Sequence, residues 1–232
     1  MKGKLTLIPT PIDESSPLEQ TAFNLLSEAA SDLSKNTLAI EDLKPGRRRW
    51  LHFGLTRDVV EDFVLYNEHT KKEACKALLK DLKSGKNVFL MSDGGLPAFC
   101  DPGVDLVREC HLSGIEVCSA PFSNSISLAL AMSGLDHNSF SFAGFLPIKS
   151  PERESQLDKF LKRGETTIFM DTPYRMKKLL QEIQSHSSGR IAFLAMDLNC
   201  ETQECYFGKI SSFINNISDF KREFILIIGP SN

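Results

Sequence analysis

The sequence lacks the short motifs that identify several large enzyme classes. It contains neither Gly-x-Gly-x-x-Gly nor Gly-x-x-x-x-Gly-Lys-Ser/Thr, which excludes the usual dinucleotide-binding fingerprint and a P-loop. Gly-x-Ser-x-Gly and His-Glu-x-x-His are also missing, so hydrolase and zinc-protease readings have little support. A ligand site must therefore be sought in motifs of another kind.

Metal-binding and disulfide patterns are equally scarce. None of the six cysteines forms a Cys-x-x-Cys pair, and the five histidines lack the spacing of metal ligands. The cysteines lie in apolar segments as often as in loops, at positions 75, 100, 110, 118, 200 and 205. We therefore expect reduced thiols and no metal centre.

The chain also has little excess charge and no long apolar run. Its formal net charge is −3, so a protein that coats nucleic acid or membrane by bulk charge is not expected. Any polyanion would have to bind to a local basic patch. The apolar stretch in MKGKLTLIPT is too short for a signal peptide, and no later run approaches the length of a membrane span. These features predict a cytoplasmic protein.

What the sequence does contain is an alternation of apolar runs of strand length with amphipathic stretches of helix length. This alternation is typical of an α/β fold with a mainly parallel sheet. The last three apolar runs leave little room for long helices between them, which favours some antiparallel pairing there. We predict two α/β domains: residues 1–119, with a mainly parallel sheet, and residues 120–232, with a mixed sheet. The expected strands lie at residues 5–8, 37–40, 62–65, 88–91, 115–118, 140–143, 167–170, 191–194, 205–207 and 224–228.

The segment MSDGGLPAFCDPG, residues 91–103, follows one of these apolar runs. Its Asp-Gly-Gly alone marks an ordinary turn. Its place at the carboxyl end of a strand expected to be central favours a ligand site, because open α/β sheets bind ligands at that edge. Asp101-Pro102-Gly103 has the form of a helix start, with Asp101 as N-cap and Pro102 at the first helical position.

A series of motifs runs along almost the whole chain: LIPTPI (7–12), IED (40–42), SDGGLPAFCDPG (92–103), SGL (133–135), GFLPIK (144–149), TPYR (172–175) and REFILIIG (222–229). An ordered series is far more specific than any one motif. In this order the chain resembles the bacterial small-subunit ribosomal RNA ribose 2′-O-methyltransferases of the RsmI type, members of the tetrapyrrole (corrin/porphyrin) methylase superfamily.

The resemblance implies two α/β domains with S-adenosylmethionine in the cleft between them, usually in a homodimer. It also implies that Ser92, Asp93, Gly94 and Gly95 line the methionine end and the sulfonium of the cofactor. A cationic sulfonium beside a zwitterionic amino acid needs carbonyl or carboxylate oxygens and free N–H groups. The other cofactor contacts implied by the resemblance are Pro11, Pro121, Ser123, Asn124, Ser125, Thr172 and Pro173.

The chain departs from the family pattern at several places. The family's Pro-Gly-Pro-Ser-Ala loop is here PFSNS, residues 121–125, which lacks a glycine that would let a cofactor approach closely. Asp13 replaces the glycine after the first motif, and MDLNC at residues 196–200 replaces a basic pattern. We expect cofactor binding to survive these changes better than the identity of the acceptor.

A basic segment, KPGRRRW at residues 44–50, follows the IED motif. Its three arginines are candidates for phosphate contacts, with Trp50 stacking on a base. The alternative is a solvated helix face with Trp50 tucked underneath. The predicted substrate contacts are Arg47, Arg48 and Arg49, with Lys149, Arg153 and Arg175 as an extension of the basic rim.

Methyl transfer is an in-line displacement, so holding the acceptor in line supplies much of the rate. A ribose hydroxyl gains from a group that accepts its proton, and the candidates are Asp93 and Glu68, with His69 as a group that orients the hydroxyl. Asp101 is a further candidate, although the role of helix cap competes for it. A histidine at a strand end is more often simply hydrogen-bonded.

The leading interpretation is an S-adenosylmethionine-dependent methyltransferase that acts on RNA, with ribosomal RNA of the small subunit as the acceptor. One alternative keeps the cofactor and replaces RNA with a tetrapyrrole or another small molecule. The other is a protein that binds the cofactor or RNA without turnover.

Overall fold

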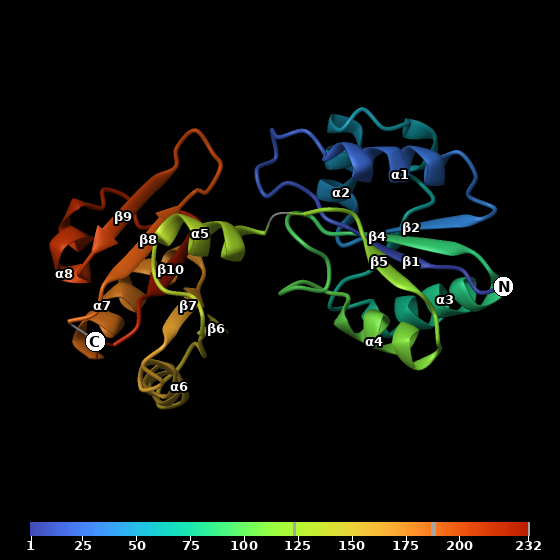
Figure 1. The fold of residues 1–232 in the computed structure, drawn as a ribbon. Helices are drawn as coiled ribbons and strands as arrows, with labels where there is room; N and C mark the ends of the chain where they lie inside the picture. Colours follow the sequence, from blue (N-terminus) through green and yellow to red (C-terminus); the bar gives the residue numbers. More distant parts are fainter. Residues whose placement is uncertain (123, 187–188, 232) are drawn as a thin grey trace. The chain divides into compact units, whose positions relative to one another are not determined.

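The structure is a computed structural model that describes residues 1–122, 124–186 and 189–231 (Figure 1). The chain divides into two compact units, Met1–Phe122 (unit 1) and Ser123–Asn232 (unit 2). Unit 1 holds a five-stranded parallel sheet and unit 2 a five-stranded mixed sheet, which confirms the predicted fold class. No helix in the described part of the chain is long and apolar enough to cross a membrane.

Unit 1 has the strand order β3-β2-β4-β1-β5, and each pair of neighbours runs parallel. The registers bring the carboxyl ends of the strands to one edge of the sheet, since Ile8 lies opposite Met91 and Ala39 opposite Leu90. Its elements are β1 (Leu5–Ile8), α1 (Gln20–Ala30), β2 (Asn36–Ile40), α2 (Leu43–His52), η1 (Arg57–Val59), β3 (Val64–Leu65), α3 (Lys71–Ser84), β4 (Asn87–Met91), α4 (Val104–Leu112) and β5 (Val117–Ser119).

Helices cover both faces of the sheet of unit 1. In Figure 1, α1 and α2 lie on one face and α3 and α4 on the other. The strands β1 and β4 are neighbours, yet the helices that follow them, α1 and α4, pack on opposite faces. Open α/β sheets bind ligands at such a divergence, at the carboxyl ends of the two adjacent strands.

The only tryptophan of the chain is buried in unit 1. Trp50 lies on α2, its Nε1 donates to the carbonyl of Thr56 at 2.7 Å, and its ring meets Phe63 edge-on at 5.1 Å between centroids. The prediction that Trp50 stacks on a base is therefore wrong, and the alternative of a tucked-in side chain holds.

Unit 2 has the strand order β6-β7-β10-β8-β9. β6 and β7 are parallel, and the other three pairs are antiparallel, which confirms the antiparallel pairing expected for the last three runs. Its elements are α5 (Ser125–Ser133), β6 (Phe140–Phe145), α6 (Glu152–Leu161), β7 (Thr166–Met170), η2 (Pro173–Arg175), α7 (Met176–His186), β8 (Ala192–Met196), β9 (Glu204–Gly208), α8 (Ile210–Phe213), η3 (Ile214–Asn216) and β10 (Phe224–Ile228).

The central strands of unit 2 are buried on both faces. Along β10, Ile225 and Ile227 pack with α5, while Leu226 and Ile228 pack in a second cluster with α6, α7 and α8. Successive residues of β10 point to opposite faces of the sheet, and both faces are buried. The whole strand is therefore apolar in the sequence.

One expected helix start is wrong. α4 begins at Val104 with Gly103 as N-cap, and Asp101 makes no capping hydrogen bond. Gly103 has φ +140°, a conformation that favours glycine, and a Cβ there would lie 2.9 Å from Cβ of Ala98. The chain therefore becomes helical only after this glycine, which leaves the Asp101 side chain free for another environment.

Candidate functional site

The loops that follow β1 and β4 are joined by hydrogen bonds at the carboxyl edge of the sheet of unit 1. Thr10 and Gly95 exchange two backbone hydrogen bonds of 2.9 Å, and Thr10 Oγ1 donates to the carbonyl of Ser92 at 3.1 Å. Ser92 Oγ donates to the carbonyl of Gly95 at 2.9 Å. Gly95 has φ +106°, which favours glycine at this position. The two loops therefore form one hydrogen-bonded unit.

Three carboxylates gather around this loop pair. The backbone N–H of Asp93 donates to Glu41 Oε2 at 3.3 Å, so the end of β2 meets the end of β4. Asp101 Oδ2 lies 4.0 Å from the position that a Cβ on Gly95 would take. Asp93 Oδ1 is buried and has no hydrogen-bond partner among the described residues. A buried carboxylate oxygen without a partner is costly, so this atom is suited to receive a ligand group.

Burial raises the pKa of two of these carboxyls. The pKa of Asp93 is raised to about 6, first by desolvation and then by the negative charge of Glu41; the backbone amide of Asp42 and the charge of Arg49 act in the opposite direction. The pKa of Asp101 is raised to about 7 by desolvation and by the charges of Glu41 and Asp93. The cluster thus holds more negative charge than its surroundings compensate.

The nearby Arg49 forms no ion pair with Asp93 or Asp101 among the described contacts. Its Nη1 donates to the carbonyl of Pro11 at 2.6 Å and its Nη2 to that of Ile12 at 3.1 Å, and only 4 % of the residue is exposed. The predicted phosphate contact by Arg49 is therefore wrong, because the guanidinium is buried and holds the loop after β1. The same Nη2 lies 3.4 Å from the position of a Cβ on Gly94, so Arg49 also lies beside the loop after β4.

The residues of this loop pair fit a cationic cofactor of the kind that the resemblance implies. S-adenosylmethionine carries a sulfonium and an ammonium group, and both favour ionised carboxylates nearby. Asp93 offers an unpartnered oxygen, Asp101 a second carboxylate, and the exposed Gly94 has no Cβ to block a close approach. Pro11 is placed here by its carbonyl bond to Arg49.

The other two predicted catalytic side chains lie farther along the same edge. Glu68 is exposed and pairs with Lys71 at 2.6 Å, while the Asn67 side chain accepts from the backbone N–H of His69 at 3.0 Å. They follow β3, and β2 separates β3 from β4, a distance of about 10 Å for two strand spacings. No contact joins Glu68 or His69 to Asp93 within the described ranges, so their catalytic role stays a prediction.

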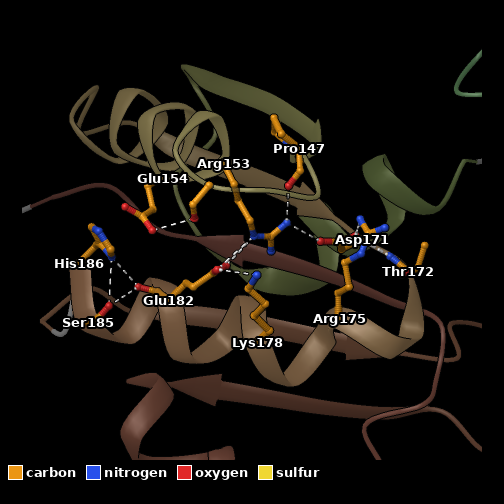
Figure 2. A network of polar contacts seen from close by, with 11 residues as sticks. Pro147, Arg153, Glu154, Asp171, Thr172, Arg175, Lys178, Glu182, Ser185 and His186 are labelled. Carbon is orange, nitrogen blue, oxygen red and sulfur yellow. Dashed lines mark hydrogen bonds and ion pairs between the residues drawn. The ribbon is translucent and has the colours of Figure 1, made fainter.

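In unit 2, a strand-end aspartate lies in a buried ionic network (Figure 2). Asp171 follows β7; its Oδ2 accepts from Arg153 Nη1 at 3.1 Å, and its Oδ1 accepts from Arg175 Nη1 at 3.0 Å and from the N–H of Thr172 at 2.9 Å. Arg153 also donates through Nε to Glu182 at 2.8 Å and through Nη1 to the carbonyl of Pro147 at 3.1 Å. The network therefore joins the start of α6, the end of β7 and α7.

The predicted role of Arg153 in a substrate rim is wrong. Its side chain is fully buried and its charge is matched by Asp171 and Glu182, so it is not available to a phosphate group. Arg175 is partly exposed but shares Asp171. Lys149 is exposed, and its contact with the substrate stays a prediction.

The remaining predicted contacts have local structural roles in the structure. Asn124 is the N-cap of α5 and accepts from the N–H of Ser127 at 2.8 Å, and Ser125 is the first residue of that helix. Thr172 and Pro173 follow Asp171 and begin η2. Pro121 is exposed at the end of unit 1, and Ser123 lies outside the described residues. The cofactor contacts proposed for these positions stay predictions.

The other two arginines of α2 that were predicted to contact the substrate bind carboxylates or carbonyls of the protein. Arg47 donates to Glu61 at 2.8 Å and to the carbonyl of Val60 at 3.0 Å, and the exposed Arg48 pairs with Glu14 at 2.6 Å. Arg48 is thus the member of the triplet whose side chain is most open to solvent.

Two residues at this site, one in the loop after β1 and one after β2, were not predicted from the sequence. Thr10 and Glu41 lie inside the quoted motifs LIPTPI and IED, but neither received a role. A carboxylate directly after a buried strand was the available signal for Glu41, because strand ends of a parallel sheet meet at one edge. The signal for Thr10 is weaker, since its hydrogen bonds depend on the partner loop 82 residues away.

Comparisons with known proteins agree with this architecture. The family model described as Tetrapyrrole (Corrin/Porphyrin) Methylases matches residues 4–214. The chain is 32 % identical over 229 residues to "Ribosomal RNA small subunit methyltransferase I" of Halalkalibacterium halodurans, covering 98 % of this chain and 76 % of that protein. It is 31 % identical over 219 residues to the protein of the same name from Thermotoga maritima, covering 94 % of each.

Solved structures show the same fold at low sequence identity. A diphthine synthase aligns with a TM-score of 0.70 at 10 % identity, covering 98 % of this chain and 90 % of that one. Uroporphyrin-III C-methyl transferase from Thermus thermophilus, complexed with S-adenyl homocysteine, aligns with a TM-score of 0.61 at 16 % identity, covering 98 % and 97 %. With the family match and the curated relatives, the chain belongs to the Tetrapyrrole (Corrin/Porphyrin) Methylases, a family of S-adenosylmethionine-dependent methyltransferases.

Proposed function

We propose that this protein transfers a methyl group from S-adenosylmethionine to a ribose 2′-hydroxyl of small-subunit ribosomal RNA. The choice of acceptor is supported by relatives named for that RNA, which match nearly the whole chain at 31 and 32 % identity. The observation that carries the assignment of the site is the unpartnered Oδ1 of Asp93, at the carboxyl edge of the parallel sheet and beside two other carboxylates.

S-adenosylmethionine, when bound, supplies an activated methyl group on a positively charged sulfur. Asp93 is suited to bind a cationic group of this ligand, because ion pairing compensates a carboxylate that is otherwise partly desolvated. Arg49 holds the loop after β1 in place through the carbonyls of Pro11 and Ile12. The bridge between Thr10 and Gly95 holds the loop after β4 against it.

The same cluster offers acceptors for the proton of a ribose hydroxyl. A general base is most effective when its pKa lies near the operating pH, and the pKa of Asp101 is raised to about 7. We propose Asp93 and Asp101 as the carboxylates from which this base is drawn, with Glu68 and His69 as the alternatives.

The oligomeric state and location follow as further parts of the proposal. We propose a homodimer, which light scattering would detect as twice the chain mass of 25.9 kDa. A monomer mass over the whole concentration range would contradict it. A ribosomal substrate would place the protein in the cytoplasm.

Transfer of a labelled methyl group tests the proposed function. The acceptors are small ribosomal subunits from a strain that lacks this protein and from the unmodified parent strain. We expect incorporation only into the RNA of the deficient strain, in a nucleoside that digestion identifies as 2′-O-methylated. Equal and negligible incorporation into both, at a cofactor concentration where calorimetry shows binding, would contradict the RNA acceptor. An absence of cofactor binding would contradict the whole proposal.

A further inference from the structure

One face of α3 carries a regular stripe of lysines. Lys72, Lys76, Lys80 and Lys83 are all exposed, and at 3.6 residues per turn they lie within an arc of about 80°. The buried residues of the same helix, Ala74, Leu78 and Leu82, lie on the opposite side and pack against the sheet. We refer to these four side chains as the α3 lysine stripe.

The α3 lysine stripe is not engaged by the protein. In residues 1–122, 124–186 and 189–231, none of the four lysines forms an ion pair, whereas the neighbouring Lys71 pairs with Glu68. The sequence analysis predicted a basic surface at the three arginines of α2. All three donate hydrogen bonds to carboxylates or carbonyls of the protein. α3 thus carries, on one helix face, four exposed lysines without an ion pair to any described residue.

The local charge differs in sign from that of the whole chain. Residues 71–86 contain six lysines and two carboxylates, a net charge of +4 in a protein of net charge −3. One of those two carboxylates, Asp81, accepts from Thr37 Oγ1 at 2.8 Å and faces the sheet side of the helix. A concentrated basic surface on an otherwise acidic protein attracts polyanions locally.

The composition of α3 itself favours a nucleic acid over a membrane, whereas the neighbouring helix α4 exposes Val104 and Leu112. A helix that lies on a membrane presents exposed apolar side chains beside its basic ones. The large exposed hydrophobic side chains found in the structure include none on α3, where the apolar residues face the core. From Lys72 to Lys83 the stripe is about 16 Å long, a length over which a nucleic-acid strand presents several phosphates.

The stripe also begins on the side of the unit that carries the candidate site. α3 follows β3, whose carboxyl end lies on the same edge of the sheet as the end of β4. From there the helix runs back along the sheet face that it shares with α4 (Figure 1).

We propose that the α3 lysine stripe binds the phosphate backbone of the RNA acceptor, away from the nucleotide that is methylated. This inference rests on the proposed function, since it names the surface by which that acceptor is held. Contacts with phosphates position an RNA without reading its sequence, so the stripe would supply affinity and orientation.

The test compares two variants with the same change of net charge. One has Lys72, Lys76, Lys80 and Lys83 replaced by glutamine; the control has Lys159, Lys162, Lys209 and Lys221, which are exposed lysines of unit 2, replaced by glutamine. Binding to small-subunit ribosomal RNA is measured over a range of salt concentrations. For the stripe variant we expect at least about tenfold weaker binding, and a slope of log K against log salt that is smaller in magnitude by about 3. Cofactor affinity should be unchanged in both.

An RNA affinity and slope equal to those of the control variant would overturn the inference, even if the wild-type protein methylates RNA. Binding of the wild-type protein to phosphatidylserine vesicles, lost in the stripe variant while RNA binding is kept, would assign the stripe to membranes and also overturn it. A wild-type protein that binds RNA through the stripe but transfers no methyl group to it would contradict only the proposed function.

Discussion

Two strand-end aspartates, one in each unit, show opposite electrostatic arrangements. Asp171, after β7, has both carboxylate oxygens occupied by Arg153, Arg175 and a backbone N–H. Asp93, after β4, has one buried oxygen with no partner in the described part of the chain and lies beside Glu41 and Asp101. The charge of Asp171 is compensated within the fold, whereas Asp93 Oδ1 is not paired by any described residue. Two aspartates at similar positions after a strand therefore differ in their partners, and under the proposed function Asp93 is the one that binds the ligand.

The largest effect is expected from removing the cation beside Asp171. Replacing Arg153 with alanine removes the fully buried cation that Asp171 and Glu182 share and leaves only the more exposed Arg175 and Lys178 beside them, so the free energy of unfolding should fall by about 3–5 kcal/mol. Urea denaturation followed by circular dichroism measures this loss.

A matched control for Arg153 lies at the end of the same helix. Lys162 follows α6 and pairs with Asp158 at 3.5 Å, but both side chains are exposed, so Lys162→Ala should cost less than about 1 kcal/mol. Equal losses in the two variants would mean that the ionic network of unit 2 is not compensated as described.

The next largest effect is expected at Asp93, the aspartate whose charge is not compensated by a described residue. Asp93→Asn keeps the shape of the side chain and removes its charge, so affinity for S-adenosylmethionine should fall about 10- to 100-fold, the range for a hydrogen bond to a charged group. Calorimetry measures the affinity, with Asp105→Asn as the control because Asp105 is exposed and pairs with Arg108. An affinity within twofold of the wild type would show that Asp93 does not face the cofactor.

The pH dependence of stability should reveal the raised pKa values of Asp93 and Asp101. With pKa values raised to about 6 and 7, Asp93 and Asp101 keep protons in the folded state that the unfolded chain releases near pH 4. Their contribution to stability is therefore largest below about pH 4 and is lost as the pH rises to about 7. The unfolding free energies of wild type and of the Asp93→Asn, Asp101→Asn double variant should diverge over this range, in favour of the variant. A difference that is constant with pH would contradict the raised pKa values.

Binding of a cationic ligand should shift the protonation equilibria of Asp93 and Asp101. The ligand favours the ionised carboxylates, so affinity should rise between about pH 5.5 and 8, and binding should release protons. Calorimetry in two buffers with different enthalpies of ionisation measures the protons released. Uptake of protons would have the wrong sign for this arrangement.

The smallest loss of stability is expected at Asp101. An N-cap aspartate contributes about 1 kcal/mol to stability, but Asp101 makes no capping bond to α4. Asp101→Asn at pH 7 should therefore cost no stability and should raise the unfolding free energy, because the variant removes a desolvated charge and its repulsion from Glu41 and Asp93. A loss of 1 kcal/mol or more would restore the role of helix cap.

The sequence was sufficient for the features that depend on local pattern. The apolar runs of β4, β7, β8 and β10 and the order of the motifs are visible without any contact information, and they lead to the fold class and to the loop at residues 92–97. Helix starts depend on finer geometry: the Asp-Pro-Gly segment has the composition of a cap, but Gly103 takes that position with a positive φ.

The partners of charged side chains were not predictable in the same way. Whether Arg153 faces solvent or a carboxylate depends on Asp171 and Glu182, which lie 18 and 29 residues away in the sequence. A run such as Arg47 to Arg49 draws attention because its residues are adjacent, yet adjacent residues point in different directions on a helix. The α3 lysine stripe has the helical spacing that places charges on one face, so this basic surface is predictable from the sequence.

The buried Trp50 gives the protein one optical probe that is confined to unit 1. Because the chain has a single tryptophan, shielded from water and bonded to Thr56 within its own unit, its fluorescence reports the melting of the parallel sheet alone. Circular dichroism reports both units together. The two signals measured on the same sample therefore separate the unfolding of the halves without cutting the chain or attaching a dye.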